Sequence, residues 1–176
     1  VWWDSEATLQ TVQCTNSAIQ DTDCEYGRMG GANEGGYVIC TNFFEQSEAF
    51  VNIGIAGTDD LGCEITSKKV MPNYQYDCTD YNFKEPVCSS NKNSNHFSKV
   101  CIGEKSETTS EYTYHTLEDI LRTRGLIHKH ITLKVDTEGG EIPAFKYFPL
   151  EYLDYIDVII MELHFEYINP ERWGNL

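Results

Sequence analysis

Basic residues are scarce in this chain of 176 residues, in which 13 lysines and arginines stand against 28 aspartates and glutamates. The formal net charge of −15 creates a surface that repels nucleic-acid phosphates and anionic lipid headgroups, so we expect neither as a partner. Apolar residues also never run for the roughly 18 positions that a membrane-spanning helix needs. We therefore expect no membrane-spanning segment.

The seven cysteines include no C-x-x-C pair, which argues against a structural zinc site. Seven cysteines are nevertheless many for a cytosolic enzyme, and the count favours a secreted or luminal protein over a cytoplasmic one. We expect at least one disulfide, with Cys14–Cys24 the first candidate and Cys78–Cys88 the second, because each pair brackets a polar loop. The cysteines in apolar strands are expected to be buried free thiols: Cys40 and Cys101.

A folded core is expected, because 40% of the residues are hydrophobic and 12% are aromatic. The length suits one domain. Residues 1–36 are polar and turn-rich, and we expect them to form an N-terminal extension. An α/β domain is expected over residues 37–176.

Strands and helices alternate along this domain. The predicted strands are apolar runs or alternating patterns, at residues 37–40, 49–55, 74–77, 99–103, 131–136 and 157–163, with a polar insertion over residues 78–98. One helix is predicted from the cap-type residues Thr58–Asp60 to about Lys69, and another from the capping box at Thr116 to Gly125. This order predicts a Rossmann-like, mostly parallel sheet with helices on both faces.

Ligands bind such sheets at the carboxyl ends of the strands. The strand at residues 49–55 leads into Gly54 and Gly57, which allow close approach of a ligand just before a helix begins. Asp77 ends the next strand, and an acid about 20 residues beyond a glycine turn is placed to bind ribose hydroxyls. Together these features favour a ligand that contains a nucleoside.

Carboxylates are dense where the last two predicted strands end. Asp136 ends a buried strand, where a charge needs a partner or a ligand, whereas Glu138 and Glu141 also suit the first turn of a helix. Glu162 and His164 end the following strand, which we expect to lie beside the first. Asp136, Glu138 and His164 have the ligand types of a divalent metal site, although we assign no metal to them.

Lys134–Glu141 resembles the K-x-D-x-E-G-x-E signature of the FkbM-type methyltransferase family, and Glu162–His164 is similar to the E-x-H that follows it. Asn52–Gly57 stands where that family has its methionine-binding glycine turn, and Tyr76–Asp77 where it has its ribose-binding acid. Gly30–Val38 is similar to a G-G-x-x-D/E-G-G-Y-V element of eukaryotic relatives. The resemblance covers most of the chain.

The resemblance implies a class I methyltransferase-like fold, S-adenosylmethionine as cofactor, and methyl transfer to a hydroxyl of a small molecule or glycan. The residues that it implies for cofactor binding are Asn52, Gly54, Gly57, Asp77 and Glu138. The implied catalytic residues are His164, Asp136 and Glu162. Among them His164 has the pKa best matched to a general base at neutral pH.

Two departures support a different hypothesis. Asn52 stands where the family has an acid, and Ala56 where it has the middle glycine of its turn. An asparagine cannot form a charge pair with the amino group of the cofactor. The alternative is a catalytically inactive methyltransferase-fold module that serves as a structural or interaction component of an extracellular assembly with protein partners. A dehydrogenase is disfavoured, because Gly54–Gly57 lacks the G-x-G-x-x-G fingerprint.

Overall fold

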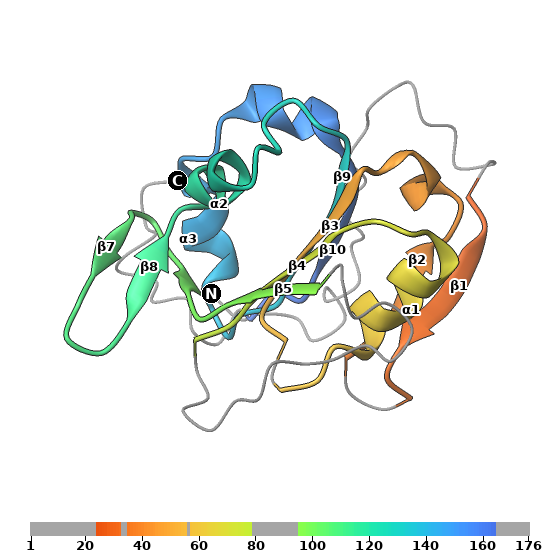
Figure 1. Ribbon diagram of the computed structural model, residues 1–176, viewed down its shortest axis with the longest axis horizontal. Coiled ribbons are helices and arrows are strands. Elements are labelled where there is room, and N and C mark those ends of the chain that lie inside the picture. Colours follow the sequence, from red (N-terminus) through yellow and green to blue (C-terminus); the bar gives the residue numbers. More distant parts are fainter. Residues whose placement is uncertain (1–23, 33–34, 56, 79–94, 165–176) are drawn as a thin grey trace, which may run out of the picture.

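The computed structural model describes residues 24–32, 35–55, 57–78 and 95–164, and these ranges define the architecture in Figure 1. Within them, every helix is too short or too polar to cross a bilayer. A five-stranded sheet forms the centre, with helices packed against it.

The central sheet consists of β3 (Ala49–Ile53), β4 (Asn73–Tyr76), β5 (Asn95–Ser98), β9 (Ile131–Val135) and β10 (Ile156–Met161). Their order is β10-β9-β3-β4-β5, and every neighbouring pair is parallel. Because parallel strands need a crossover connection, helices are carried onto the faces of the sheet. The predicted parallel α/β sheet is thus confirmed, as is the prediction that the last two strands are neighbours. The architecture is compatible with a Rossmann-like fold.

Two layers cover the sheet (Figure 1). On one face lie α2 (Leu117–Thr123) and α3 (Glu141–Lys146), and on the other lie α1 (Asp60–Lys68) and the hairpin of β1 (Tyr26–Gly30) and β2 (Gly36–Cys40). Both faces of the central sheet are therefore covered.

The sequence of β3 shows how both layers are anchored. All five of its residues are buried. Val51 and Ile53 pack into the cluster that contains the buried residues of α2 and α3, whereas Phe50 packs into the cluster of α1 and the hairpin. A strand covered on both faces needs nearly continuous apolar residues, which is the pattern that identified it.

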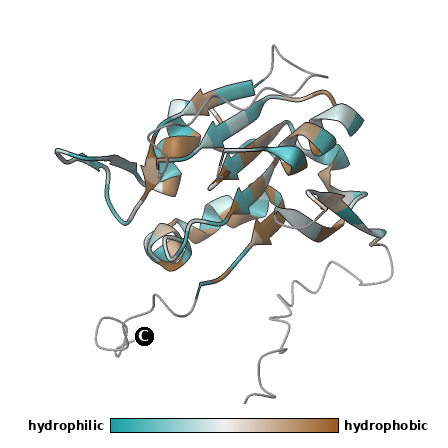
Figure 2. Cartoon of the chain, turned by 90° about the horizontal axis from the view of Figure 1, so that it is seen from below, coloured by the Kyte–Doolittle hydropathy of each residue, from teal (hydrophilic) through white to brown (hydrophobic). Residues whose placement is uncertain are grey.

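Shorter elements complete the structure. The 3-10 helices η2 (Phe43–Gln46) and η3 (Leu150–Tyr155) precede β3 and β10. A small sheet of order β6-β8-β7 joins β6 (Cys101–Ile102), β7 (Glu107–Thr108) and β8 (Thr113–His115). The β7–β8 hairpin projects away from the central sheet, and its tip is hydrophilic (Figure 2).

The third predicted strand is wrong in position. The strand that completes the central sheet is β5, which falls in the expected polar insertion, and the range 99–103 contains only β6 of the small sheet. Strand β5 lies at the sheet edge and has Phe97 as its single apolar residue. An edge strand needs no continuous apolar run, so the criterion that finds buried strands misses it.

Two disulfides join described residues, Cys24–Cys40 with Cα atoms 5.4 Å apart and Cys78–Cys101 with Cα atoms 5.0 Å apart. Cys63 is disulfide-bonded as well. The prediction of at least one disulfide is confirmed. The prediction that Cys40 and Cys101 are free thiols is wrong, because both take part in these bonds.

Both predicted pairings are also wrong. Cys24 does not pair with Cys14, nor Cys78 with Cys88, and Cys14 and Cys88 themselves lie outside the described residues. Both pairings were predicted because the two cysteines are close along the chain, but strand pairing decides which cysteines meet. The antiparallel β1–β2 pair, for example, sets Tyr26 opposite Cys40 and so brings Cys24 to it.

Helix α2 begins with the predicted cap. The side chain of Thr116 accepts a hydrogen bond from the amide of Asp119 at 3.1 Å. We expect Thr116→Ala to lower the free energy of unfolding by about 1 kcal/mol, measured by urea denaturation. Thr123→Ala at the exposed end of the same helix is the matched control, and it should be neutral, because alanine favours helix and Thr123 only bonds back to the carbonyl of Asp119. Equal effects of the two changes would contradict the capping role.

Candidate functional site

A cleft of about 930 Å³ opens at the carboxyl ends of β3, β4 and β9. Strand β3 lies between β4 and β9. The strands that follow β3 first add on one side, as β4 and β5, and the later strands β9 and β10 add on the other side. Parallel α/β sheets bind ligands at such a reversal of strand order. The volume is in the range of small-molecule and cofactor sites.

Most of the residues singled out in the sequence meet here. The predicted site residues that line the cleft are Asn52, Gly54, Asp77, Asp136, Glu138 and Glu162. Gly57 and His164 are not part of its wall. His164 instead lies behind the carboxylates, with its ring against the beginning of α3.

Gly54 is required by the protein's own backbone. It has a φ of +81°, and a Cβ atom at this position would come within 1.5 Å of the carbonyl oxygen of Asp136. Its amide donates to the carbonyl of Tyr76 at 2.8 Å. The glycine therefore lets the ends of β3, β4 and β9 converge at the floor of the cleft.

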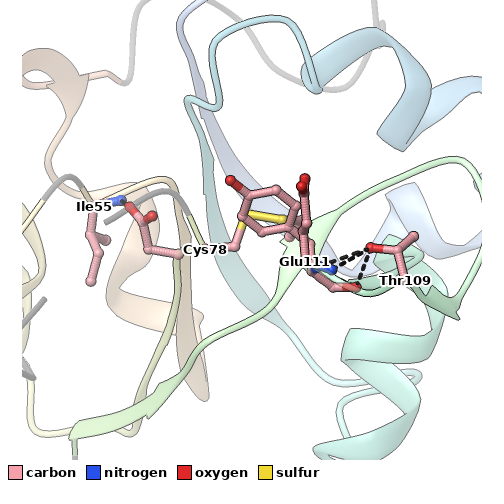
Figure 3. The surroundings of a disulfide bond; sticks show 7 residues. Ile55, Cys78, Thr109 and Glu111 are labelled. Carbon is pink, nitrogen blue, oxygen red and sulfur yellow. Dashed lines mark hydrogen bonds between the residues drawn. A yellow bond between two sulfur atoms is a disulfide. The ribbon is translucent and has the colours of Figure 1, made fainter. Parts of the chain in front are cut away.

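Asp77 is positioned by the same turn. It is buried, and its Oδ2 accepts a hydrogen bond from the amide of Ile55 at 3.0 Å. The next residue, Cys78, carries the disulfide to Cys101, and both cysteines line the cleft. Figure 3 shows Ile55 and Cys78 on neighbouring parts of this wall. The crosslink thus ties the end of β4 to β6 of the small sheet.

The small sheet contributes an aromatic wall. Tyr112 and Tyr114 line the cleft, with their ring centroids 6.2 Å apart in an edge-to-face arrangement. The Oγ1 of Thr109 accepts hydrogen bonds from the amides of Glu111 at 3.3 Å and Tyr112 at 3.0 Å, which fixes the turn before β8 (Figure 3). This side of the cleft is suited to contact with a planar or apolar group.

Asp59 is a carboxylate that the sequence showed only as a helix cap. It caps α1 through the amide of Gly62 at 2.7 Å. It also accepts from the side-chain amides of Asn52 at 2.6 Å, Asn73 at 2.6 Å and Gln75 at 2.5 Å. Asn52 thus donates its side-chain amide to the carboxylate of Asp59. An acid therefore does stand beside the glycine turn, but it is Asp59 rather than the residue at position 52.

Asp136 is held by two groups from different layers. Its Oδ2 accepts a hydrogen bond from the hydroxyl of Tyr37 at 2.5 Å and lies 3.3 Å from the ammonium of Lys134. Lys134 also donates to the carbonyl of Gly54. Burial outweighs the neighbouring Asp136 carboxylate and lowers the pKa of Lys134. Burial and the hydrogen bond to Asp136 both raise the pKa of Tyr37. Tyr37 comes from the β1–β2 hairpin, and its role could not be read from local sequence.

His164 is surrounded by carboxylates. Its Nδ1 lies 3.2 Å from Oε1 of Glu141, while its Nε2 lies 3.6 Å from Glu138, 3.6 Å from Glu162 and 4.0 Å from Asp136. Burial disfavours the imidazolium, but the hydrogen bond to Glu141 and the surrounding charges outweigh it and raise the pKa of His164. The structure thus brings Asp136, Glu162 and His164 together, as the sequence predicted.

The lining is strongly acidic. Among the described residues on the wall, one ammonium, that of Lys134, faces six carboxylates: Asp59, Asp60, Asp77, Asp136, Glu138 and Glu162. Such a cleft concentrates cations and repels phosphates. A cationic or hydroxyl-rich ligand therefore fits its electrostatics better than a nucleotide phosphate.

No protein-family model, curated protein or solved structure matches the chain. The function must therefore be inferred from the cleft itself.

Proposed function

We propose that the cleft binds S-adenosylmethionine and that the domain transfers its methyl group to a hydroxyl of a small molecule or glycan. The observation that carries this proposal is the excess of carboxylates in a cleft at the reversal of strand order. S-adenosylmethionine has a positively charged sulfonium, which this lining attracts. A dinucleotide has two phosphates, which the same lining repels.

The ends of β3 and β4 provide groups for the two polar parts of this cofactor. Asp77, at the end of β4, would bind the ribose hydroxyls. Asn52 and Asp59 lie beside Gly54, where the methionine part would bind. The aromatic wall and the Cys78–Cys101 disulfide border the Asp77 side, where the base would lie.

The acceptor hydroxyl would bind at the opposite side, near the ends of β9 and β10. Methyl transfer is a direct displacement, so aligning the hydroxyl oxygen with the methyl group is the main requirement. Asp136, fixed by Tyr37 and Lys134, would orient the hydroxyl. Asp136 would also accept its proton, because it lines the cleft, whereas His164 lies behind the carboxylates, where Glu141 fixes its ring.

Calorimetric titration with S-adenosylmethionine tests the cofactor assignment. Asp77→Asn preserves the shape of the side chain and an acceptor for Ile55 but removes the charge that binds ribose. We expect it to weaken cofactor binding by about 1–3 kcal/mol, roughly 5- to 150-fold in Kd. Asp154→Asn, on the exposed surface of η3, is the matched control and should bind as the unmodified protein does. An unchanged affinity of Asp77→Asn would remove Asp77 from the site.

The second candidate function is that of a binding module in a secreted assembly. The two disulfides support it, because such bonds persist in oxidising compartments. The same titration separates the two functions. A folded protein that shows no heat of binding with S-adenosylmethionine would favour the module, whereas binding followed by methyl transfer would favour the enzyme.

A further inference from the structure

We propose that a divalent metal ion binds at Nε2 of His164, between the carboxylates of Asp136, Glu138 and Glu162. The site lies where β9 and β10 end, behind the acceptor side of the cleft. It does not depend on methyl transfer, since its evidence is the geometry of these side chains alone.

The imidazole is oriented as metal-binding histidines are. Metal-binding histidines generally have the second ring nitrogen bonded to a carboxylate or carbonyl, which fixes the ring and increases the basicity of the ligating nitrogen. Here Nδ1 of His164 lies 3.2 Å from Glu141, and only 9% of the imidazole side chain is exposed. Glu141 is itself buried and is fixed by the amides of Thr137 at 2.6 Å and Gly139 at 3.1 Å. The ring is thus rigidly supported on its Nδ1 side.

Three carboxylates from different segments of the chain lie near Nε2. Glu138 belongs to the turn before α3, Glu162 follows β10, and Asp136 follows β9. Their oxygens lie 3.6, 3.6 and 4.0 Å from Nε2. These distances exceed the length of a hydrogen bond, but two ligands of one cation at bonds of about 2.1 Å are separated by roughly 3–4 Å. Each of the three carboxylates therefore lies within reach of an ion bound at Nε2.

The two oxygens of Asp136 have separate partners. Oδ2 is held by Tyr37 and Lys134, whereas Oδ1 faces His164. The carboxylate can therefore remain anchored to the protein while its second oxygen binds a cation. One ligand atom each of Asp136, Glu141 and His164 also lie within 4.8 Å of one another, so two of the proposed ligands belong to a grouping of metal-ligating type on the buried side.

The ligand set indicates the class of ion. One imidazole nitrogen with carboxylate oxygens suits Mn²⁺ or Zn²⁺ better than Ca²⁺, which prefers oxygen ligands only. Placed here, the ion would draw the four side chains together and offset the repulsion between the three carboxylates. It would also lie next to the cleft wall, where it could polarise a bound hydroxyl.

Titration with Mn²⁺ alone, without cofactor or acceptor, tests the proposal. We expect one Mn²⁺ per chain by calorimetry, and electron spin echo spectroscopy should show coupling of the ion to a histidine nitrogen. His164→Gln should remove the nitrogen coupling, and both His164→Gln and Glu162→Gln should weaken binding at least about 10-fold. Glu151→Gln, an exposed glutamate of η3, is the matched control and should change neither result.

The nitrogen coupling is decisive because a chain of net charge −15 can collect Mn²⁺ on its surface through carboxylates alone. Mn²⁺ binding without nitrogen coupling, or binding of equal affinity in His164→Gln, would overturn the proposal. So would the absence of binding at millimolar Mn²⁺ in the unmodified protein. Circular dichroism of each variant shows that a loss of binding is not a loss of fold. A metal that binds where S-adenosylmethionine does not would leave this inference standing and refute the proposed function.

Discussion

Asp136→Asn is expected to abolish methyl transfer and to leave the fold intact. Asparagine has the same shape and retains an oxygen that can accept a hydrogen bond from Tyr37, so the end of β9 should keep its conformation. The negative charge that pairs with Lys134 and faces His164 is lost. Because an acceptor hydroxyl must be oriented while its proton is removed, we expect a fall of at least about 100-fold in the rate of methyl transfer.

The measurement is the formation of S-adenosylhomocysteine with an acceptor found by screening monosaccharides and small glycans. Asp154→Asn serves again as the control for loss of one surface charge. Circular dichroism and thermal unfolding establish that the variant is folded. A folded Asp136→Asn protein that binds the cofactor and remains fully active would show that the chemistry takes place elsewhere.

Asp59→Ala should have the largest effect on stability. It removes the acceptor of four buried donors, namely the amide of Gly62 and the side-chain amides of Asn52, Asn73 and Gln75. A buried donor left without a partner costs about 1–3 kcal/mol. The total of at least about 4 kcal/mol is a large fraction of the 5–15 kcal/mol that typically stabilises a domain. Urea denaturation should show a midpoint shifted far downward or a chain that is already unfolded.

Asp60→Ala is the matched control for this change. Asp60 is the next residue, also lies in the first turn of α1, and is exposed. Its carboxylate interacts favourably with the helix dipole, so its loss should cost only about 0.3–1 kcal/mol. Similar losses for the two variants would mean that the buried amide cluster around Asp59 does not stabilise the fold.

Regular periodicity explains which parts of the fold could be predicted. The sequence predicts β3 and β9 because a strand covered on both faces must be apolar throughout. It also predicts β10, an edge strand that is only partly buried, because five of its six residues are apolar. The sequence predicts the cap at Thr116 and narrows the other to Thr58–Asp60, of which Asp59 is the cap, because capping depends on residues only three positions apart. Strand β5 was missed because its edge position places no such demand on its side chains.

The residues of the candidate site also divide into those that could be predicted from the sequence and those that could not. Asp136, Glu162 and His164 could be placed together, because consecutive strands of a parallel sheet usually lie side by side and end at one edge. Tyr37 could not, since its contact with Asp136 depends on how the β1–β2 hairpin packs across the sheet. The disulfide partners were mispredicted for the same reason, because tertiary pairing rather than loop length brings Cys78 to Cys101.

The order of strands in the sheet also affects the chain during its synthesis. Strand β3 pairs on one side with β4, which follows soon after it in the chain. On the other side it pairs with β9, so residues 49–53 have no partner on that side until residues 131–135 have been synthesised. Until β9 leaves the ribosome, one edge of β3 has no neighbour, and its backbone groups are open to pairing with another chain. At about 5–20 residues per second this interval lasts several seconds. During that time the nascent chain is exposed to strand pairing with other chains, even though the finished sheet buries the same strand completely.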